Sequence, residues 1–145
     1  MDFLSAIDLS ASALSAERIR MNAISSNIAN ANVTRTPEGG PYRRKDVVFQ
    51  AVPQKKSFGD ILEDKMEGNL REVQVARVHS DQGPPRLVYN PRHPDADENG
   101  YVAMPNVNPV EEMVNMLNAT RSYEANITAI NTSKAMAMKA LEISQ

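Results

Sequence analysis

The sequence contains no cysteine and no tryptophan, and only 5% of its 145 residues are aromatic. Without cysteine, disulfide bonds, thiol catalysis and cysteine-based zinc sites are excluded. Few aromatic side chains argue against a large globular core, because aromatic residues supply much of the area that a core buries. The net charge is −2, so the chain also lacks the basic excess typical of proteins whose main partner is nucleic acid.

The first twenty residues, MDFLSAIDLSASALSAERIR, have no basic leader and no continuous apolar run. They therefore match neither a cleaved signal peptide nor a transmembrane helix. From this segment we expect a protein that stays in the cytoplasm or leaves it by a route that needs no such signal.

Proline and glycine are missing from the C-terminal segment 110–145. Alternate steps of three and four residues from Met113 give a mostly apolar series over four heptads, which is typical of a helix that winds against partners. Pro109 suits the first turn of this helix, and a helix of this length would be roughly 50 Å long. That is too long for the core of a compact domain, so we expect a partner. The predicted seam residues here are Met113, Met116, Tyr123, Ile127, Ile130, Ala137 and Leu141.

The N-terminal segment 2–32 repeats this pattern and also lacks proline and glycine. Its predicted seam residues are Phe3, Ile7, Leu14, Met21, Ile24 and Ile28. Two such helices at opposite ends predict an antiparallel, coiled-coil-like inner domain built from 1–32 and 106–145. The alternative, an ordinary helical bundle, is disfavoured because the middle of the chain offers no third long helix.

The middle region, 33–105, changes to short β-type runs separated by proline- and glycine-rich turns. We predict strands at 46–52, 72–79, 86–89 and 101–104, with a bulge in the second, and either a short helix or a mobile segment at 60–67. These strands would form a small antiparallel sheet or extended hairpins looped out between the helices. The expected fold class is therefore mainly α with a small β part.

Residues Asp95 to Gly100 match the opening of a calcium loop, with oxygen ligands at positions one, three and five and glycine at six. The twelfth position, however, holds Asn106 instead of glutamate, and prolines flank the segment, so an Asp-rich turn explains the same residues. His79 and His93 lack zinc-ligand spacing, and we find no nucleophile motif. We predict no catalytic, cofactor or metal site, and no enzyme.

The stretch SSNIANANVTRTPEGGPYRRK, residues 25–45, resembles the Asn-rich signature that follows the first helix in bacterial flagellar axial proteins. HPDADENGYVAMPNVN at 93–108 and the tail from 113 to 143 are similar to the proximal-rod branch of that family. The motif residues that carry the resemblance are Asn27, Asn30, Asn32, Pro37, Gly40 and Tyr42.

The resemblance implies a structural subunit of the proximal rod, exported by the flagellar type III system without a cleaved signal peptide. It implies helical assembly through the terminal helices into a periplasmic drive shaft that transmits torque from membrane ring to hook. Expected partners are further copies of the chain, other proximal-rod subunits, adjacent distal-rod subunits and the junction with the membrane ring and export gate. Two alternatives are a soluble coiled-coil adaptor or export chaperone, and a calcium-binding module at 95–106.

Overall fold

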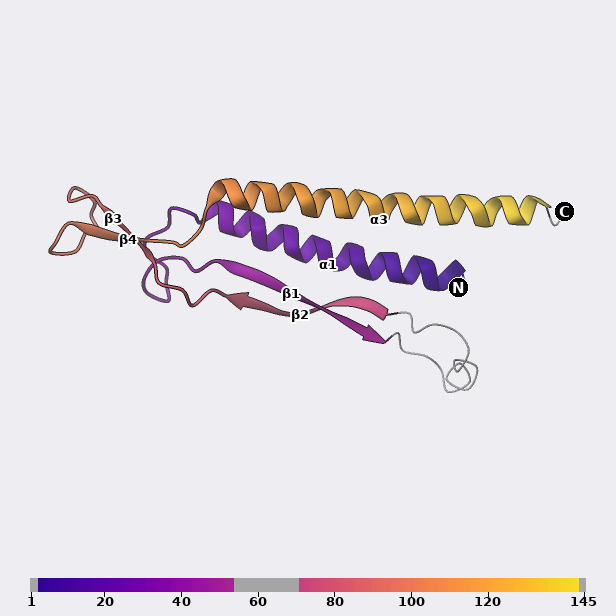
Figure 1. Ribbon diagram of the computed structural model, residues 1–145, viewed down its shortest axis with the longest axis horizontal. Coiled ribbons are helices and arrows are strands. Elements are labelled where there is room, and N and C mark those ends of the chain that lie inside the picture. The colour runs from indigo at the N-terminus through magenta and orange to yellow at the C-terminus, as the bar shows by residue number, and fades with distance from the viewer. Residues whose placement is uncertain (1–2, 54–70, 144–145) are drawn as a thin grey trace.

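The computed structural model describes residues 3–53 and 71–143, and the short helix or mobile segment expected at 60–67 lies outside them. Helix α1 (Phe3–Ala29) is followed by four strands, and helix α3 (Pro109–Ile143) ends the described chain. The molecule is elongated, with α1 lying between α3 on one side and the first β-hairpin on the other (Figure 1). The predicted fold class, mainly α with a small β part, is confirmed.

Helices α1 and α3 pack side by side in opposite directions. Asn27 near the end of α1 meets Glu112 in the first turns of α3, and the hydroxyl of Thr120 lies 3.9 Å from the sulfur of Met21. Ala119 on α3 is completely buried, because a side chain this small lets the two backbones approach closely. Helix α3 is the longer of the two, with 35 residues against 27, and its last turns extend past the start of α1 (Figure 1).

The first hairpin packs on the side of α1 that faces away from α3. Strand β1 (Lys45–Pro53) pairs antiparallel with β2 (Arg71–Ser80), and each is slightly longer than the sequence predicted. Val48 pairs with Arg77 and Phe49 with Val75, so the expected bulge is confirmed.

Two specific contacts join this hairpin to α1. The guanidinium of Arg20 lies 4.1 Å above the ring of Phe49, and the backbone N–H of Val73 donates to the hydroxyl of Ser12 at 3.3 Å. Of the β1 side chains, Val47 is buried. A two-stranded sheet is marginal on its own, so the helix supplies the packing that stabilises it.

The second hairpin, β3 (Arg86–Tyr89) with β4 (Tyr101–Met104), projects from one end of the molecule (Figure 1). Its strands have the predicted bounds, and they pack against neither described helix. At its turn Gly100 adopts a φ of +80°, which favours glycine, and an added Cβ would lie 2.9 Å from the ring of Tyr89. Figure 1 thus shows a paired-helix body with one hairpin packed on it and one projecting from it.

The core is small and rich in alanine and valine. Its buried apolar side chains are Ala16, Ala23, Ile24, Ala31, Val47, Val102, Val107 and Ala119. Within 3–53 and 71–143, no helix is both long enough and apolar enough to cross a membrane. So small a core leaves much apolar side-chain surface in contact with solvent.

Candidate functional site: a polar junction between the helices

The centre of the site is Asn27, whose side chain is fully buried at the end of α1. Its amide nitrogen donates to the backbone carbonyl of Lys45 and to the carboxylate of Glu112, both at 2.8 Å. Its amide oxygen accepts from the backbone N–H of Lys45 at 2.8 Å and from the hydroxyl of Tyr42 at 3.0 Å. Both donors and both acceptor positions of this one amide are therefore satisfied, as burial requires.

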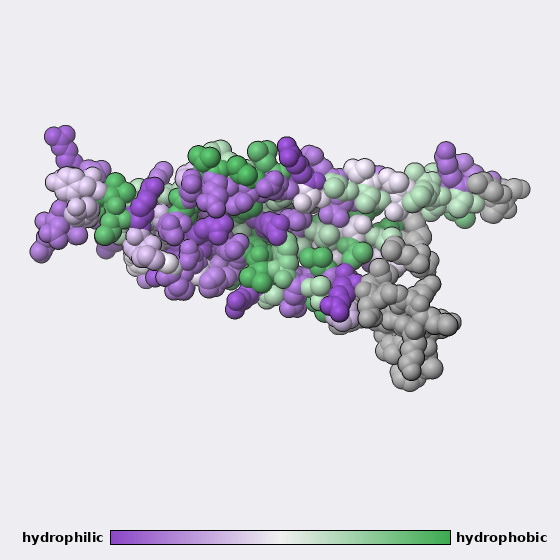
Figure 2. All heavy atoms as spheres, viewed as in Figure 1, coloured by the Kyte–Doolittle hydropathy of each residue, from purple (hydrophilic) through white to green (hydrophobic). Residues whose placement is uncertain are grey.

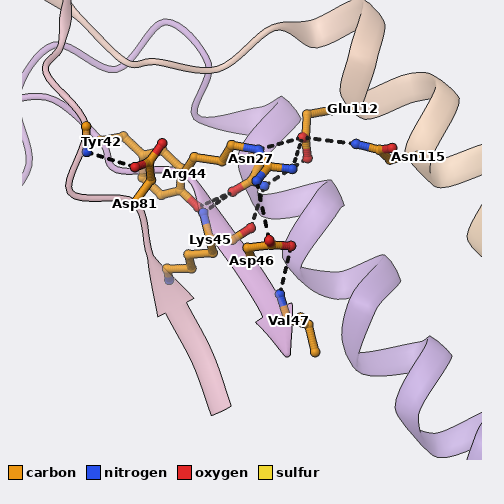
Figure 3. A network of polar contacts seen from close by, with 10 residues as sticks. Asn27, Tyr42, Arg44, Lys45, Asp46, Val47, Asp81, Glu112 and Asn115 are labelled. Carbon is orange, nitrogen blue, oxygen red and sulfur yellow. Dashed lines mark hydrogen bonds and ion pairs between the residues drawn. The ribbon is translucent and has the colours of Figure 1, made fainter. Parts of the chain in front are cut away.

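Glu112 and Arg44 complete the arrangement, which we call the polar junction: Asn27, Tyr42, Arg44, the Lys45 backbone and Glu112. Nε of Arg44 donates to Oε1 of Glu112 at 2.9 Å, and NH2 lies 2.9 Å from the same oxygen. The side chain of Glu112 is only 1% exposed, whereas that of Arg44 is 26% exposed. Figure 3 shows these side chains converging from α1, from the start of β1 and from α3.

The pKa of Arg44 is raised above its ordinary value. Partial burial is the largest single influence and lowers it, but the hydrogen bond and the charge of Glu112, with smaller help from Asp46 and Glu111, outweigh that burial. Arg44 is therefore charged throughout the ordinary pH range and provides a permanent counterion for the buried carboxylate.

The turn between α1 and β1 brings Tyr42 to Asn27. Thr36 closes this turn, since its backbone N–H donates to the carbonyl of Gly40 at 2.9 Å. Gly39 and Gly40 have φ values of 90° and 76°, which side chains rarely adopt. These positive φ values explain why the TPEGGPYRRK segment has glycine at both positions.

The six motif residues lie in different environments. Asn27 and Tyr42 are joined in the polar junction, and the side chain of Asn30 donates to the carbonyl of Ser26 at 2.8 Å, at the end of α1. Asn32, Pro37 and Gly40 are exposed at the turn. Only part of the motif therefore forms the buried site.

No sequence motif pairs Arg44 with Glu112. Arg44 belongs to a basic run beside a turn, which is typical of a solvated segment, and Glu111 and Glu112 are both acidic residues in the first turn of a helix, where the helix dipole alone accounts for them. Glu111 is indeed exposed. No signal in the sequence distinguishes the two glutamates except helical phase: Glu112, unlike Glu111, lies on the same side of α3 as Met116 and Ala119.

The predicted seam residues divide between the two sides of each helix. On α3, Met116, Tyr123, Ile130 and Ala137 are half-buried, whereas Met113, Ile127 and Leu141 are exposed. On α1, Ile24 is buried, Ile7, Leu14, Met21 and Ile28 are half-buried, and the side chain of Phe3 lies outside the described atoms. Their proposed role as contacts between subunits stays a prediction.

The first turns of α3 also present an apolar surface that we call the outer face: Val110, Met113, Val114 and Leu117. These side chains are 66%, 51%, 52% and 60% exposed, respectively. Apolar side chains gather over this part of α3 in Figure 2. An exposed apolar cluster of this kind marks an interaction surface more often than an isolated exposed residue does.

The acidic turn at 95–100 is held by internal hydrogen bonds. Oδ1 of Asp97 accepts from the backbone N–H groups of Asn99 and Tyr101, at 2.9 and 2.8 Å, and Oδ2 of Asp95 accepts from the hydroxyl of Thr34 at 2.8 Å. Among the described residues no group of three or more acidic or histidine side chains is arranged to hold a metal ion. The geometry of this turn is that of a hairpin corner tied back to the chain at Thr34.

Comparisons with known proteins identify two family models along the chain. Residues 7–35 match the flagella basal body rod protein model, and residues 98–143 match the model described as flagellar basal body rod FlgEFG protein C-terminal. These two segments include α1 from residue 7 onward and the whole of α3, and with them Asn27 and Glu112.

Full-length relatives are also similar. The chain is 47% identical to the flagellar basal-body rod protein FlgC of Bacillus subtilis, over 94% of this chain and 95% of the relative. It is 46% identical to that of Salmonella typhimurium over the whole of both chains, and 44% identical to that of Borreliella burgdorferi over 100% of this chain and 99% of the relative.

Proposed function

The chain belongs to the FlgC family of flagellar basal-body rod proteins and is a structural rod subunit. From this premise we propose that it assembles helically through its terminal helices into the proximal rod. The rod then acts as the drive shaft that transmits torque from the membrane ring to the hook. The polar junction fixes the register of the two helices, and the surfaces that they leave exposed contact neighbouring subunits.

One observation carries this proposal: a long helix pair with a buried, fully hydrogen-bonded junction leaves a row of apolar side chains exposed on α3. The described chain buries Asn27 and Glu112 while Val110 and Leu117 stay 66% and 60% exposed. A chain that folds alone normally turns its apolar helix stripe inward. The exposed row is the expected feature of a subunit whose packing is completed by other subunits, and a heterologous contact that does not close produces a filament.

We propose as partners further copies of the chain, the other proximal-rod subunits, the adjacent distal-rod subunits and the junction between membrane ring and export gate. The site of action is the periplasmic rod, reached through the flagellar type III system without a cleaved signal peptide. The division into an inner domain of 1–32 and 106–145 and a middle region of 33–105 accords with this role. The inner domain would assemble, and the middle region would brace adjacent subunits.

The proposal is tested in the bacterium that produces the chain. Deletion of the chain should leave basal bodies without a complete rod, seen by electron microscopy of isolated particles, and the cells should not swim. Re-expression of the chain should restore both the rod and swimming. Complete rods in the deletion strain would refute the proposal.

A further inference from the structure

The described strands form two two-stranded sheets, so each strand has one outer edge that its partner does not cover. Three of these four edges carry a side chain that is hydrogen-bonded to their backbone. At β1, the Asn27 amide bonds both backbone groups of Lys45, and at β2 the hydroxyl of Ser12 accepts from the N–H of Val73. Side chains that occupy the backbone groups of an edge keep it from pairing with another chain.

The outer edge of β4 is capped by the acidic turn that precedes it. The backbone N–H of Tyr101 donates to Oδ1 of Asp97 at 2.8 Å, and the carbonyl of Tyr101 accepts from the backbone N–H of Asp97 at 2.8 Å. Asp97 therefore bonds both outward groups of this residue, as a neighbouring strand would. The acidic turn thus closes one edge of the second hairpin.

Strand β3, at the other edge of this hairpin, has no such cap. The N–H of Asn90 donates to the carbonyl of Gly100 at 2.9 Å, and hydrogen-bonded pairs alternate with other pairs along an antiparallel ladder. Counted back from that bond, Leu87 and Tyr89 belong to the pairs without hydrogen bonds, so their N–H and C=O groups point away from β4. Within the described residues, no hydrogen bond occupies these four groups.

The second hairpin also receives no support from the helices. Its four-residue strands pack against neither of them, and it projects from the end of the molecule (Figure 1). Leu87 and Tyr89 are 64% and 65% exposed, and they share one face of the sheet with Tyr101. A two-stranded sheet is marginal in water, so a third strand beside β3 would stabilise it by adding hydrogen bonds and by covering this face.

The free backbone groups identify the occupant as an extended polypeptide, because an adjoining strand presents N–H and C=O groups at the spacing of Leu87 and Tyr89. A second copy would have to offer its own β3, since the other three edges carry caps, and pairing of like edges closes into a two-fold dimer. We propose that β3 receives an extended strand of a different protein, with apolar side chains beside Leu87 and Tyr89. The inference rests on the proposed function only in taking that protein to be another component of the rod.

Tyr89 and Tyr101 provide matched probe positions, because they lie directly opposite each other on one face of the hairpin. A photoreactive phenylalanine analogue replaces either residue in the full chain, the cells that produce it are irradiated, and linked products are identified by mass spectrometry. Position 89 should link to a different protein roughly tenfold more than position 101, because β3 separates position 101 from the added strand. Equal yields at the two positions, or a product that joins two copies of the chain, would overturn the inference.

Two proline variants test the backbone bonds. Leu87→Pro removes an outward N–H of β3, and an edge strand tolerates proline where its N–H faces outward. The yield of the link from position 89 should fall roughly tenfold, as expected for the loss of one hydrogen bond. Ala103→Pro removes the outward N–H at the capped edge of β4 and should leave the yield unchanged. Equal yields from the two proline variants would contradict strand addition at β3.

Failure of the inference and failure of the proposed function give different results. If rods form but position 89 gives no link to another protein, the inference is wrong and the proposed function stands. Complete rods in cells that lack the chain would instead refute the proposed function.

Discussion

The two sides of α3 differ most in its first three turns. The inner side places Glu112, Asn115 and Ala119 against the rest of the chain, with Glu112 1% and Ala119 0% exposed. The outer side carries Val110, Val114 and Leu117, each more than half exposed. Within the chain this helix start is therefore held by hydrogen bonds and close approach. Its apolar side chains remain exposed, the reverse of the usual distribution on a helix.

This difference separates two tasks that a core usually combines. Buried hydrogen bonds are directional and fix one register, because an unsatisfied buried group costs free energy. Apolar contacts are less directional and are suited to repeated association. Substitutions on the inner side should therefore unfold the chain, and substitutions on the outer side should prevent assembly of a chain that remains folded.

The largest effect is expected from Glu112→Ala. It removes the partner of Arg44 and one of the two acceptors of the Asn27 amide nitrogen, and the Lys45 carbonyl remains as the other. The free energy of unfolding should fall by about 3–5 kcal/mol, measured by urea denaturation of the monomeric chain. Glu111→Ala, one residue earlier and exposed, is the control and should change it by less than about 0.5 kcal/mol. Equal losses of unfolding free energy in the two variants would show that the polar junction does not make Glu112 more important for stability than Glu111.

A smaller loss is expected from Asn27→Ala, about 2–3 kcal/mol, because the Lys45 backbone and the Tyr42 hydroxyl lose their buried partner. Thermal unfolding followed by circular dichroism measures it. Asn22→Ala on the exposed side of α1 is the matched control. A loss of unfolding free energy as small as that of the control would mean that water satisfies the Lys45 backbone and the Tyr42 hydroxyl as well as the amide does.

Ala119→Leu tests the close approach of the helices. The fully buried alanine leaves no room for a larger side chain, so the free energy of unfolding should fall by about 1–3 kcal/mol. Ala125→Leu, exposed on the same helix, should be nearly neutral. Both are compared by urea denaturation, and an unchanged Ala119→Leu variant would contradict tight packing at this position.

Leu117→Gln should change the free energy of unfolding by less than about 0.5 kcal/mol, since the side chain is 60% exposed in the single chain. In the bacterium the same variant should prevent rod assembly, counted by electron microscopy of basal bodies. Leu87→Gln, 64% exposed on the second hairpin, controls for the loss of an exposed leucine as such. Normal rods with Leu117→Gln would remove the distinction between the two sides of α3.

The smallest expected effect is the dependence on pH of the stabilisation that Arg44 provides. Because the pKa of Arg44 is raised on folding, its charge contributes stability that is fully present below the ordinary pKa of an arginine and is lost only as pH rises through the higher folded pKa. The loss of unfolding free energy caused by Arg44→Gln should therefore be the same at pH 7 and pH 9, measured by urea denaturation. A loss that differs between these pH values would assign the stabilisation to another group.

Prediction from the sequence succeeded where the signal was local. The periodic segments became α1 and α3, the runs at 86–89 and 101–104 became strands with the predicted bounds, and Pro109 begins α3. The junction was not found, because Asn27, Arg44 and Glu112 lie far apart in the sequence and each has an ordinary local explanation. The phase of the α3 seam was only partly informative: Tyr123 is half-buried, whereas Met113 and Ile127, assigned to the same seam, are exposed.

The sequence by itself determined two long helices, short strands between them and a chain without thiol chemistry. These features depend on neighbouring residues: periodicity, helix propensity and the residues that turns require. The tertiary structure decided which side of each helix is buried, and that Glu112 and not Glu111 meets Asn27. A difference of one residue turns a helical side chain by about 100°, so only the packing of α3 on α1 fixes which side chains remain exposed.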